Sequence, residues 1–412
     1  MSATGADPGP ARSSGTRRGE LALLVIGIVV LAASLRPAVT SLGAVLDLVR
    51  VDLGIAGWLA GVLTALPVLS FAAVGALTHL LTQRFGVHRT ALFALLAIVA
   101  GSGVRAIADS PAVFTAGSAV ALAGMAVGNV SLPPLVKLHF PDRIPTLTAV
   151  YSCALLTGAA IPAGLTVPIA DVAGTWRWGL GLWAVAAGVA ALPWVLLLRQ
   201  DVREQEPAAQ LVPRRLVRSG LAWSMAVFFG AQSAQAYSQF GWLPSIYTDA
   251  GLSPESAALM LMVLTLIGVP APLVLPAYAR ATDDHRPLVV VFSVVTLAGW
   301  TGLLVWPTTV PWLWAALLGL GGSAFPWVLA MIALRTRTTE GTAALSGFVQ
   351  STGYLLSAVG PLGTALLYDI SGDWTLPLCV LMALTLPMLW TGLHFARPRL
   401  LEDELAAAGG SG

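Results

Sequence analysis

Long apolar segments recur along the whole chain and alternate with short polar turns. The first covers residues 21–46. The others cover 57–81, 90–108, 112–136, 145–170, 176–198, 219–245, 255–278, 287–306, 311–334, 342–368 and 375–395. A helix needs about 20 apolar residues to cross the hydrocarbon core of a bilayer. The pattern therefore predicts an all-α membrane protein with twelve transmembrane helices.

One long polar stretch interrupts this pattern near the middle of the chain. Residues 199–218 carry several acidic and basic side chains and no apolar run. We therefore expect two pseudo-symmetric six-helix bundles, over residues 20–198 and 219–396, joined by a cytoplasmic linker. Residues 1–19 are polar and rich in Gly, Ser and Arg, which predicts a disordered cytoplasmic tail. Residues 397–412 form the second predicted tail.

Composition excludes several classes of function. Of the 412 residues 57% are hydrophobic and only 10% are charged, far fewer charged residues than in soluble domains. A net charge of +2 without a basic stripe gives no sign of nucleic-acid binding. The two cysteines, Cys153 and Cys379, lie in apolar segments, so we expect no disulfide framework, metal site or cofactor. Motifs of proteases, acyl transferases and ATPases are absent, and we expect no enzymatic activity.

The distribution of positive charge predicts the orientation in the membrane. Lys and Arg gather in the two tails, the linker and the turns on the same side, and apart from Arg36 only Arg50, Arg105 and Arg177 lie elsewhere. By the positive-inside rule both termini are cytoplasmic. A signal peptide cleaved near Ala33 is the alternative, but the apolar pattern resumes directly after Arg36.

Arg36 is the only ionisable side chain between residues 21 and 46. At 1.5 Å of rise per residue it lies ~22 Å from the start of the span, past the middle of the bilayer. A charge at this depth normally faces a bundle interior or a water-filled cavity, and Pro37 predicts a kink beside it. An unpaired cation in a cavity favours an anion-binding site. The alternative is an arginine satisfied by carbonyls at the kink and by water.

Two later segments carry polar side chains at helical spacing. In residues 219–245 these are Gln232, Gln235 and Gln239, and in residues 342–368 they are Ser346, Gln350, Tyr354 and Ser357. Each set occupies one face of a helix. We expect at least one of these faces to contact substrate, although polar side chains in membrane helices also serve only to join helices.

Single polar residues and small residues give weaker signals. Asn129 and Tyr151 fit a site and a contact between helices equally well. The Gly- and Pro-rich stretches 158–168 and 319–326 are interpreted as places of close packing and bending.

The turn around residues 75–89 resembles the signature loop of the major facilitator superfamily in Gly75, Arg84, Gly86 and Arg89. The acidic residue of that signature is absent, and His79 stands near its place. The resemblance implies two parallel six-helix halves with substrate bound at their interface near the bilayer midplane.

Longer strings resemble the bacterial cyanate and 2-nitroimidazole (CynX/NimT) family within this superfamily. They are residues 35–41 (LRPAVTS), 128–130 (GNV), 176–178 (WRW), 229–233 (FGAQS) and 345–354 (LSGFVQSTGY). The resemblance supports Arg36 and adds Thr40 and Tyr237 to the candidate substrate-binding residues. It also implies a bacterial cytoplasmic membrane as the location.

The predicted function is secondary active transport of a small, cyanate-like anion by alternating access, with Arg36 as the anion-binding group. The expected partners are this small molecule and the lipid bilayer, and the protein is expected to act as a monomer. Export of a small neutral heteroaromatic compound resembling nitroimidazole is one alternative. A non-transporting membrane sensor or enzyme is the alternative from another class, because fold alone does not define function.

Overall fold

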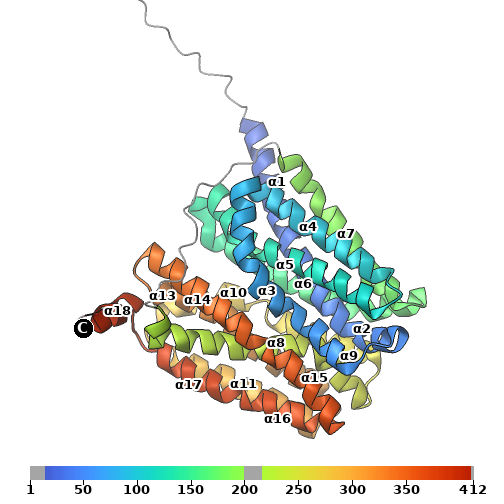
Figure 1. The fold of residues 1–412 in the computed structure, drawn as a ribbon. Helices are drawn as coiled ribbons and strands as arrows, with labels where there is room; N and C mark the ends of the chain where they lie inside the picture. Colours follow the sequence, from blue (N-terminus) through green and yellow to red (C-terminus); the bar gives the residue numbers. More distant parts are fainter. Residues whose placement is uncertain (1–13, 199–215, 410–412) are drawn as a thin grey trace, which may run out of the picture.

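The computed structural model describes residues 14–198 and 216–409, which are almost entirely helical and form two bundles (Figure 1). The first bundle contains α1 (Ser14–Leu35), α2 (Pro37–Leu53), α3 (Gly57–Phe85), α4 (Val87–Ala106), α5 (Pro111–His139), α6 (Ile144–Ala173) and α7 (Trp176–Leu197). The second contains α8 (Gly220–Asp249), α9 (Pro254–Ile267), α10 (Ala271–Ala281), α11 (Arg286–Val305), α12 (Pro311–Gly322), α13 (Ala324–Leu334), α14 (Thr339–Ser357), α15 (Val359–Ser371), α16 (Thr375–Ala383) and α17 (Thr385–Phe395). A short helix, α18 (Leu401–Gly409), follows. No strand occurs among the described residues.

Local sequence signals set many of the helix ends. The hydroxyl oxygen of Ser219 accepts a hydrogen bond from the backbone N–H of Ala222, 3.1 Å away, and so caps the start of α8. Gly54, Gly174 and Gly372 follow α2, α6 and α15 with φ angles of 64°, 71° and 73°. Such left-handed residues end helices, and glycine adopts this conformation without strain.

Five of the membrane crossings consist of two helices rather than one, and a proline lies at each break. The pairs are α1 with α2, α9 with α10, α12 with α13, α14 with α15, and α16 with α17. The corresponding prolines are Pro37, Pro270, Pro326, Pro361 and Pro387. A proline has no N–H to offer the carbonyl four residues earlier, so the ladder of helical hydrogen bonds is interrupted there. Four of the five breaks fall in the second bundle.

Among the residues that the structure describes, ten crossings are long and apolar enough to span a membrane by length and composition. The remaining two of the predicted twelve are α8 and the α14–α15 pair, which carry the polar faces found in the sequence. Both contact α3 of the first bundle, and most side chains of α8 are buried. Because α8 is largely shielded from lipid, this crossing can hold more polar residues.

The two bundles converge at one end of the molecule and separate at the other (Figure 1). We call the end where α7 stops and α8 starts the linker side, and the opposite end the far side. Toward the far side, a side chain at Gly43 would collide with the carbonyl of Phe240, and one at Gly57 with the carboxylate of Asp369. These glycines allow α2 and α3 to approach α8 and α15 closely.

The structure differs from the sequence-based expectation at two places. The α1 helix begins at Ser14, inside the segment expected to be disordered up to residue 19, because extending a helix that has already formed costs little. Arg105, expected at the far-side end of its span, is only 1% exposed, and its Nη1 donates to the carbonyl of Ala38 at 2.8 Å. The close approach of α4 and α5 at Gly101 draws this arginine inside. The side chain of His79 and most of the linker lie outside the described residues.

Candidate functional site

Arg36 lies at the break between α1 and α2, as predicted, and its side chain reaches across to the second bundle. Its carbonyl accepts hydrogen bonds from the backbone N–H groups of Val39 and Thr40, at 3.0 and 3.2 Å, which start α2. Its Nη1 donates to the hydroxyl of Tyr237 on α8, 3.0 Å away. Among the described residues no carboxylate forms a salt bridge with Arg36. The positive charge is therefore held by a neutral phenol.

A cavity of about 90 Å³ lies between the bundles beside this arginine. The first bundle contributes Arg36, Leu156 and Ala159 to its wall. The second bundle contributes Gln232, Ser233, Ala236, Tyr237, Gln239, Phe240, Leu264, Thr265, Gly268, Gly319, Gly322, Ser323, Phe325 and Pro326. Because a single water needs about 10–15 Å³, the cavity holds several water-sized groups.

Three helix breaks meet at this cavity. Arg36 precedes α2, Gly268 precedes α10, and Ser323 precedes α13, and all three residues line the wall. The N-terminal end of a helix carries a partial positive charge because its first N–H groups have no partner within the helix. Discontinuous helices in transporters direct such ends at anionic groups of the substrate. Each break also carries the carbonyl end of the preceding helix, so it offers partial charges of both signs to the cavity wall.

The predicted glutamine face of α8 lines a recess that adjoins the cavity. Gln232, Gln235 and Gln239 contribute to its wall together with Thr296 and Met388. The Oε1 of Gln235 accepts a hydrogen bond from the indole N–H of Trp300 at 2.9 Å. Gln235 is thereby fixed in the wall of the recess, which has a volume of about 10 Å³, enough for one water-sized group.

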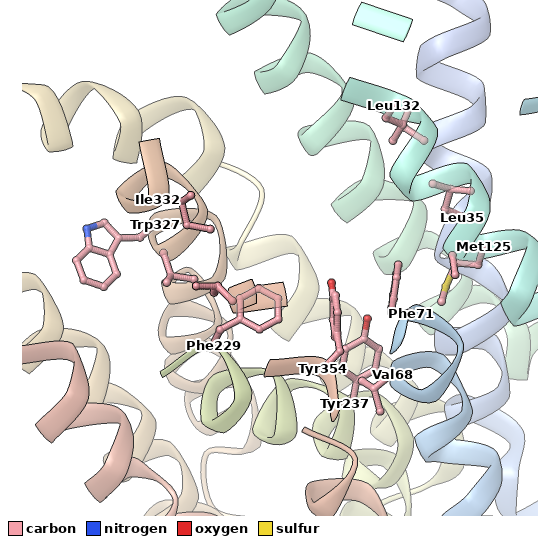
Figure 2. Close-up of a cluster of buried hydrophobic side chains, with 14 of the residues drawn as sticks. Leu35, Val68, Phe71, Met125, Leu132, Phe229, Tyr237, Trp327, Ile332 and Tyr354 are labelled. Atoms are coloured by element: carbon pink, nitrogen blue, oxygen red, sulfur yellow. The ribbon is translucent and has the colours of Figure 1, made fainter. Parts of the chain in front are cut away.

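Aromatic rings form the side of the site next to Arg36. Tyr237 packs edge-on against Phe240, with ring centroids 5.8 Å apart. Tyr354 of α14 stacks on Phe71 of α3 at 4.6 Å and an interplanar angle of 11°. Figure 2 shows Tyr237, Tyr354 and Phe71 side by side between the bundles. The stack of Phe71 on Tyr354 joins the two bundles close to Tyr237, which accepts the hydrogen bond from Arg36.

Five predicted site residues, Thr40, Asn129, Tyr151, Gln350 and Tyr354, do not line this cavity or its recess. Thr40 is fully buried, and its hydroxyl lies 3.4 Å from the carbonyl of Arg36. Gln350 donates to the hydroxyl of Ser346 at 2.8 Å, one turn earlier on α14, and Tyr354 stacks on Phe71. Asn129 and Tyr151 are half-buried on α5 and α6.

Sequence reasoning missed several lining residues. Ser233 neighbours the predicted glutamines on α8, whereas Gly322, Ser323 and Phe325 come from a stretch interpreted only as packing. A signal did exist in that stretch: Pro326 leaves the carbonyl of Gly322 without its helical donor. Gln232 replaces the missing backbone donor, because its Nε2 lies 3.4 Å from that carbonyl.

The fold and the cavity together define a class of protein. Two helical bundles with a central cavity at helix breaks are typical of secondary transporters. Within the described residues, no group of three or more His, Cys, Asp and Glu could hold a metal ion. The architecture is therefore that of a multi-pass membrane transporter.

Comparisons with known proteins agree with this class. A model of the Major Facilitator Superfamily matches residues 22–361. The 2-nitroimidazole transporter of Escherichia coli (strain K12) is 33% identical over 379 residues, which cover 92% of this chain and 96% of that protein. The cyanate transport protein CynX of the same organism is 29% identical over 382 residues, covering 89% and 99%.

A solved structure shows the same fold. The crystal structure of the nucleoside transporter NupG superposes with a TM-score of 0.75 at 11% identity, over 91% of this chain and 99% of that one. The chain belongs to the Major Facilitator Superfamily. It is a transporter rather than an enzyme, and the resemblance to the cyanate and 2-nitroimidazole relatives is confirmed.

Proposed function

We propose that the protein is a secondary transporter of a small anion and that Arg36 is the anion-binding group. The observation that carries this proposal is the position of the guanidinium, which lines the cavity between the bundles and bonds a phenol rather than a carboxylate. A cation at membrane depth needs a counter-charge. An anion in the cavity would supply it and would form charge-assisted hydrogen bonds with the planar guanidinium.

Alternating access would follow from movement of the bundles about this site. The two bundles are in close contact on the far side, at Gly43 and Gly57. This contact supports access of substrate to the cavity from the linker side in this conformation. Opening the far side would require α2 and α3 to separate from α8 and α15. We place the linker side in the cytoplasm, so that both termini of the monomer lie inside the bacterial cytoplasmic membrane. A C-terminal reporter that is active only outside the cytoplasm would contradict this orientation.

Flux into proteoliposomes tests the proposal. Wild-type protein should take up cyanate down an imposed gradient, and Arg36→Ala should abolish uptake. Arg286→Ala is the matched control, because Arg286 is a partly exposed arginine paired with Asp284 outside the cavity. Equal uptake by wild type and Arg36→Ala would refute the role of Arg36. Anion binding without flux would instead support a sensor.

Transport of a neutral heteroaromatic compound is the second candidate, and the aromatic wall favours it. Tyr237, Phe240 and Phe325 line the cavity, and a relative is named a 2-nitroimidazole transporter. Arg36 would then donate hydrogen bonds or stack on the ring. In the same vesicles, uptake of 2-nitroimidazole that exceeds uptake of every anion would favour this candidate.

A further inference from the structure

A second set of polar atoms lies in the wall that the second bundle contributes to the cavity. The side chains of Gln232 and Ser233 are only 4% and 1% exposed. Within the described part of the chain, Oε1 of Gln232 and Oγ of Ser233 have no hydrogen-bond partner. Both residues line the cavity. Buried polar atoms are seldom left unpaired, so a bound molecule is the natural partner for them.

The orientation of the Gln232 amide follows from the helix break at Ser323. Because Pro326 has no N–H, the carbonyl of Gly322 lacks its usual donor. The Nε2 of Gln232 lies 3.4 Å from this carbonyl and is the only end of the amide that can donate to it. The acceptor, Oε1, is therefore the end left for a ligand. A ligand group that meets it must be a hydrogen-bond donor.

The volume of the cavity indicates the size of such a ligand. A triatomic anion bound to Arg36 and Tyr237 would fill at most about half of it. The cavity volume of about 90 Å³ corresponds to roughly six to nine water-sized groups, as in a single substituted ring. The aromatic side chains Tyr237, Phe240 and Phe325 suit a planar ligand.

We propose, on the basis of the anion-transport function above, that the substrate is a monocyclic aromatic anion with a hydrogen-bond donor on the side away from its charge. The anionic group binds Arg36 and the hydroxyl of Tyr237. The donor binds Oε1 of Gln232, with Ser233 beside it. The ring lies between the aromatic side chains. Gln232 is thus a specificity residue for the neutral end of the substrate.

Calorimetric titration of the purified full chain with matched benzoates tests this proposal. The probes are benzoate, 4-hydroxybenzoate and 4-methoxybenzoate, which differ only at the end away from the carboxylate. A hydroxyl donates and a methoxy group does not. The hydroxyl compound should bind about 2- to 12-fold more tightly than benzoate, the range for one neutral hydrogen bond. The methoxy compound should show no such gain.

Two variants and one control assign the gain to the proposed atoms. Gln232→Leu should bring the ratio of the two affinities close to one, and Ser233→Ala should reduce it. Gln350→Leu is the matched control, since Gln350 bonds Ser346 and does not line the cavity, and it should keep the wild-type ratio. Circular dichroism confirms that each variant is folded.

Three outcomes would overturn the inference: equal affinity for the hydroxyl and methoxy compounds, a ratio that survives in Gln232→Leu, or no binding of any benzoate. None of them touches the proposed function, which is tested separately by the dependence of cyanate uptake on Arg36.

Discussion

Two helices of the second bundle, α8 and α14, carry polar side chains at helical spacing, but only α8 presents them to the cavity. Gln232, Gln235 and Gln239 of α8 all line the recess beside Arg36. On α14, Gln350 donates to Ser346 one turn earlier, and Tyr354 stacks on Phe71 of the other bundle. The same pattern in sequence therefore forms part of a cavity wall in one helix and a packing surface in the other.

The difference lies in which hydrogen bonds are completed inside the protein. The hydroxyl of Ser357 donates to the carbonyl of Tyr354, 2.8 Å away, so this hydroxyl has its hydrogen-bond partner within its own helix. On α8 the Oε1 of Gln232 is buried and without a partner among the described residues. Changes at the unpaired atoms of α8 should therefore alter binding, whereas changes at the paired or packed residues of either helix should alter stability.

Tyr354→Ala should have the greatest effect on stability. Tyr354 is 4% exposed and packs on both Phe71 and Phe229. Removing a large buried aromatic side chain typically costs ~3–5 kcal/mol. Thermal unfolding in detergent should show a clearly lowered Tm. Tyr354→Phe, which keeps the ring, should restore most of it. A Tm equal to that of wild type in Tyr354→Ala would contradict the packing role of α14.

Gln235→Met should have a smaller effect, because it leaves the buried indole N–H of Trp300 without its acceptor. An unsatisfied buried donor costs roughly 1–3 kcal/mol. The same change at Gln350 removes only a bond to Ser346 and should lower the stability by ~0.5–1.5 kcal/mol at most. Chemical denaturation of both variants measures the difference. A larger loss in Gln350→Met than in Gln235→Met would reverse the comparison of the two helices.

Changing the pH between about 5 and 8 should have almost no effect on the affinity for a fully ionised anion. No carboxylate or histidine is among the described residues that line the cavity and its recess, and a guanidinium stays charged below about pH 12.

On the linker side, hydrogen bonds from Arg286 lower the pKa of Asp284 to about 2. Since this pKa lies below the ordinary value of ~3.9, the stability contributed by that pair is lost only as the pH falls toward 2.

Calorimetric titrations at several pH values test this expectation. A step in affinity within the range would show that a titrating group outside the described cavity wall takes part in binding. Asp47, on α2 beside Arg50, would then be the first residue to replace.

Much of the fold was predictable because membrane spans are encoded locally. Apolar segments of spanning length gave the crossings, and the polar stretch 199–218 gave the division into two bundles. Arg36 could be recognised because a lone charge in an apolar segment needs a cavity or a partner. The glutamine face of α8 followed from helical periodicity alone.

The rest of the site depends on contacts between distant segments. Whether α8 or α14 faces the cavity is decided by how the bundles meet, and periodicity within one helix does not contain that information. Phe71 and Phe325 looked like ordinary apolar residues of their spans. The stretch 319–326 was interpreted as packing because glycine and proline carry no functional group, yet its freed carbonyl at Gly322 orients Gln232.

The most direct measurement is the affinity of wild type, Arg36→Lys and Arg36→Gln for cyanate and for 2-nitroimidazole, with folding checked by Tm. The account predicts that Arg36→Gln weakens cyanate binding by roughly 10- to 150-fold, which corresponds to the ~1.5–3 kcal/mol of a hydrogen bond to a charged group. Arg36→Lys should fall between the two, because an ammonium keeps the charge but lacks the planar fork. Equal binding of cyanate by all three proteins would remove Arg36 from the site and contradict the central claim.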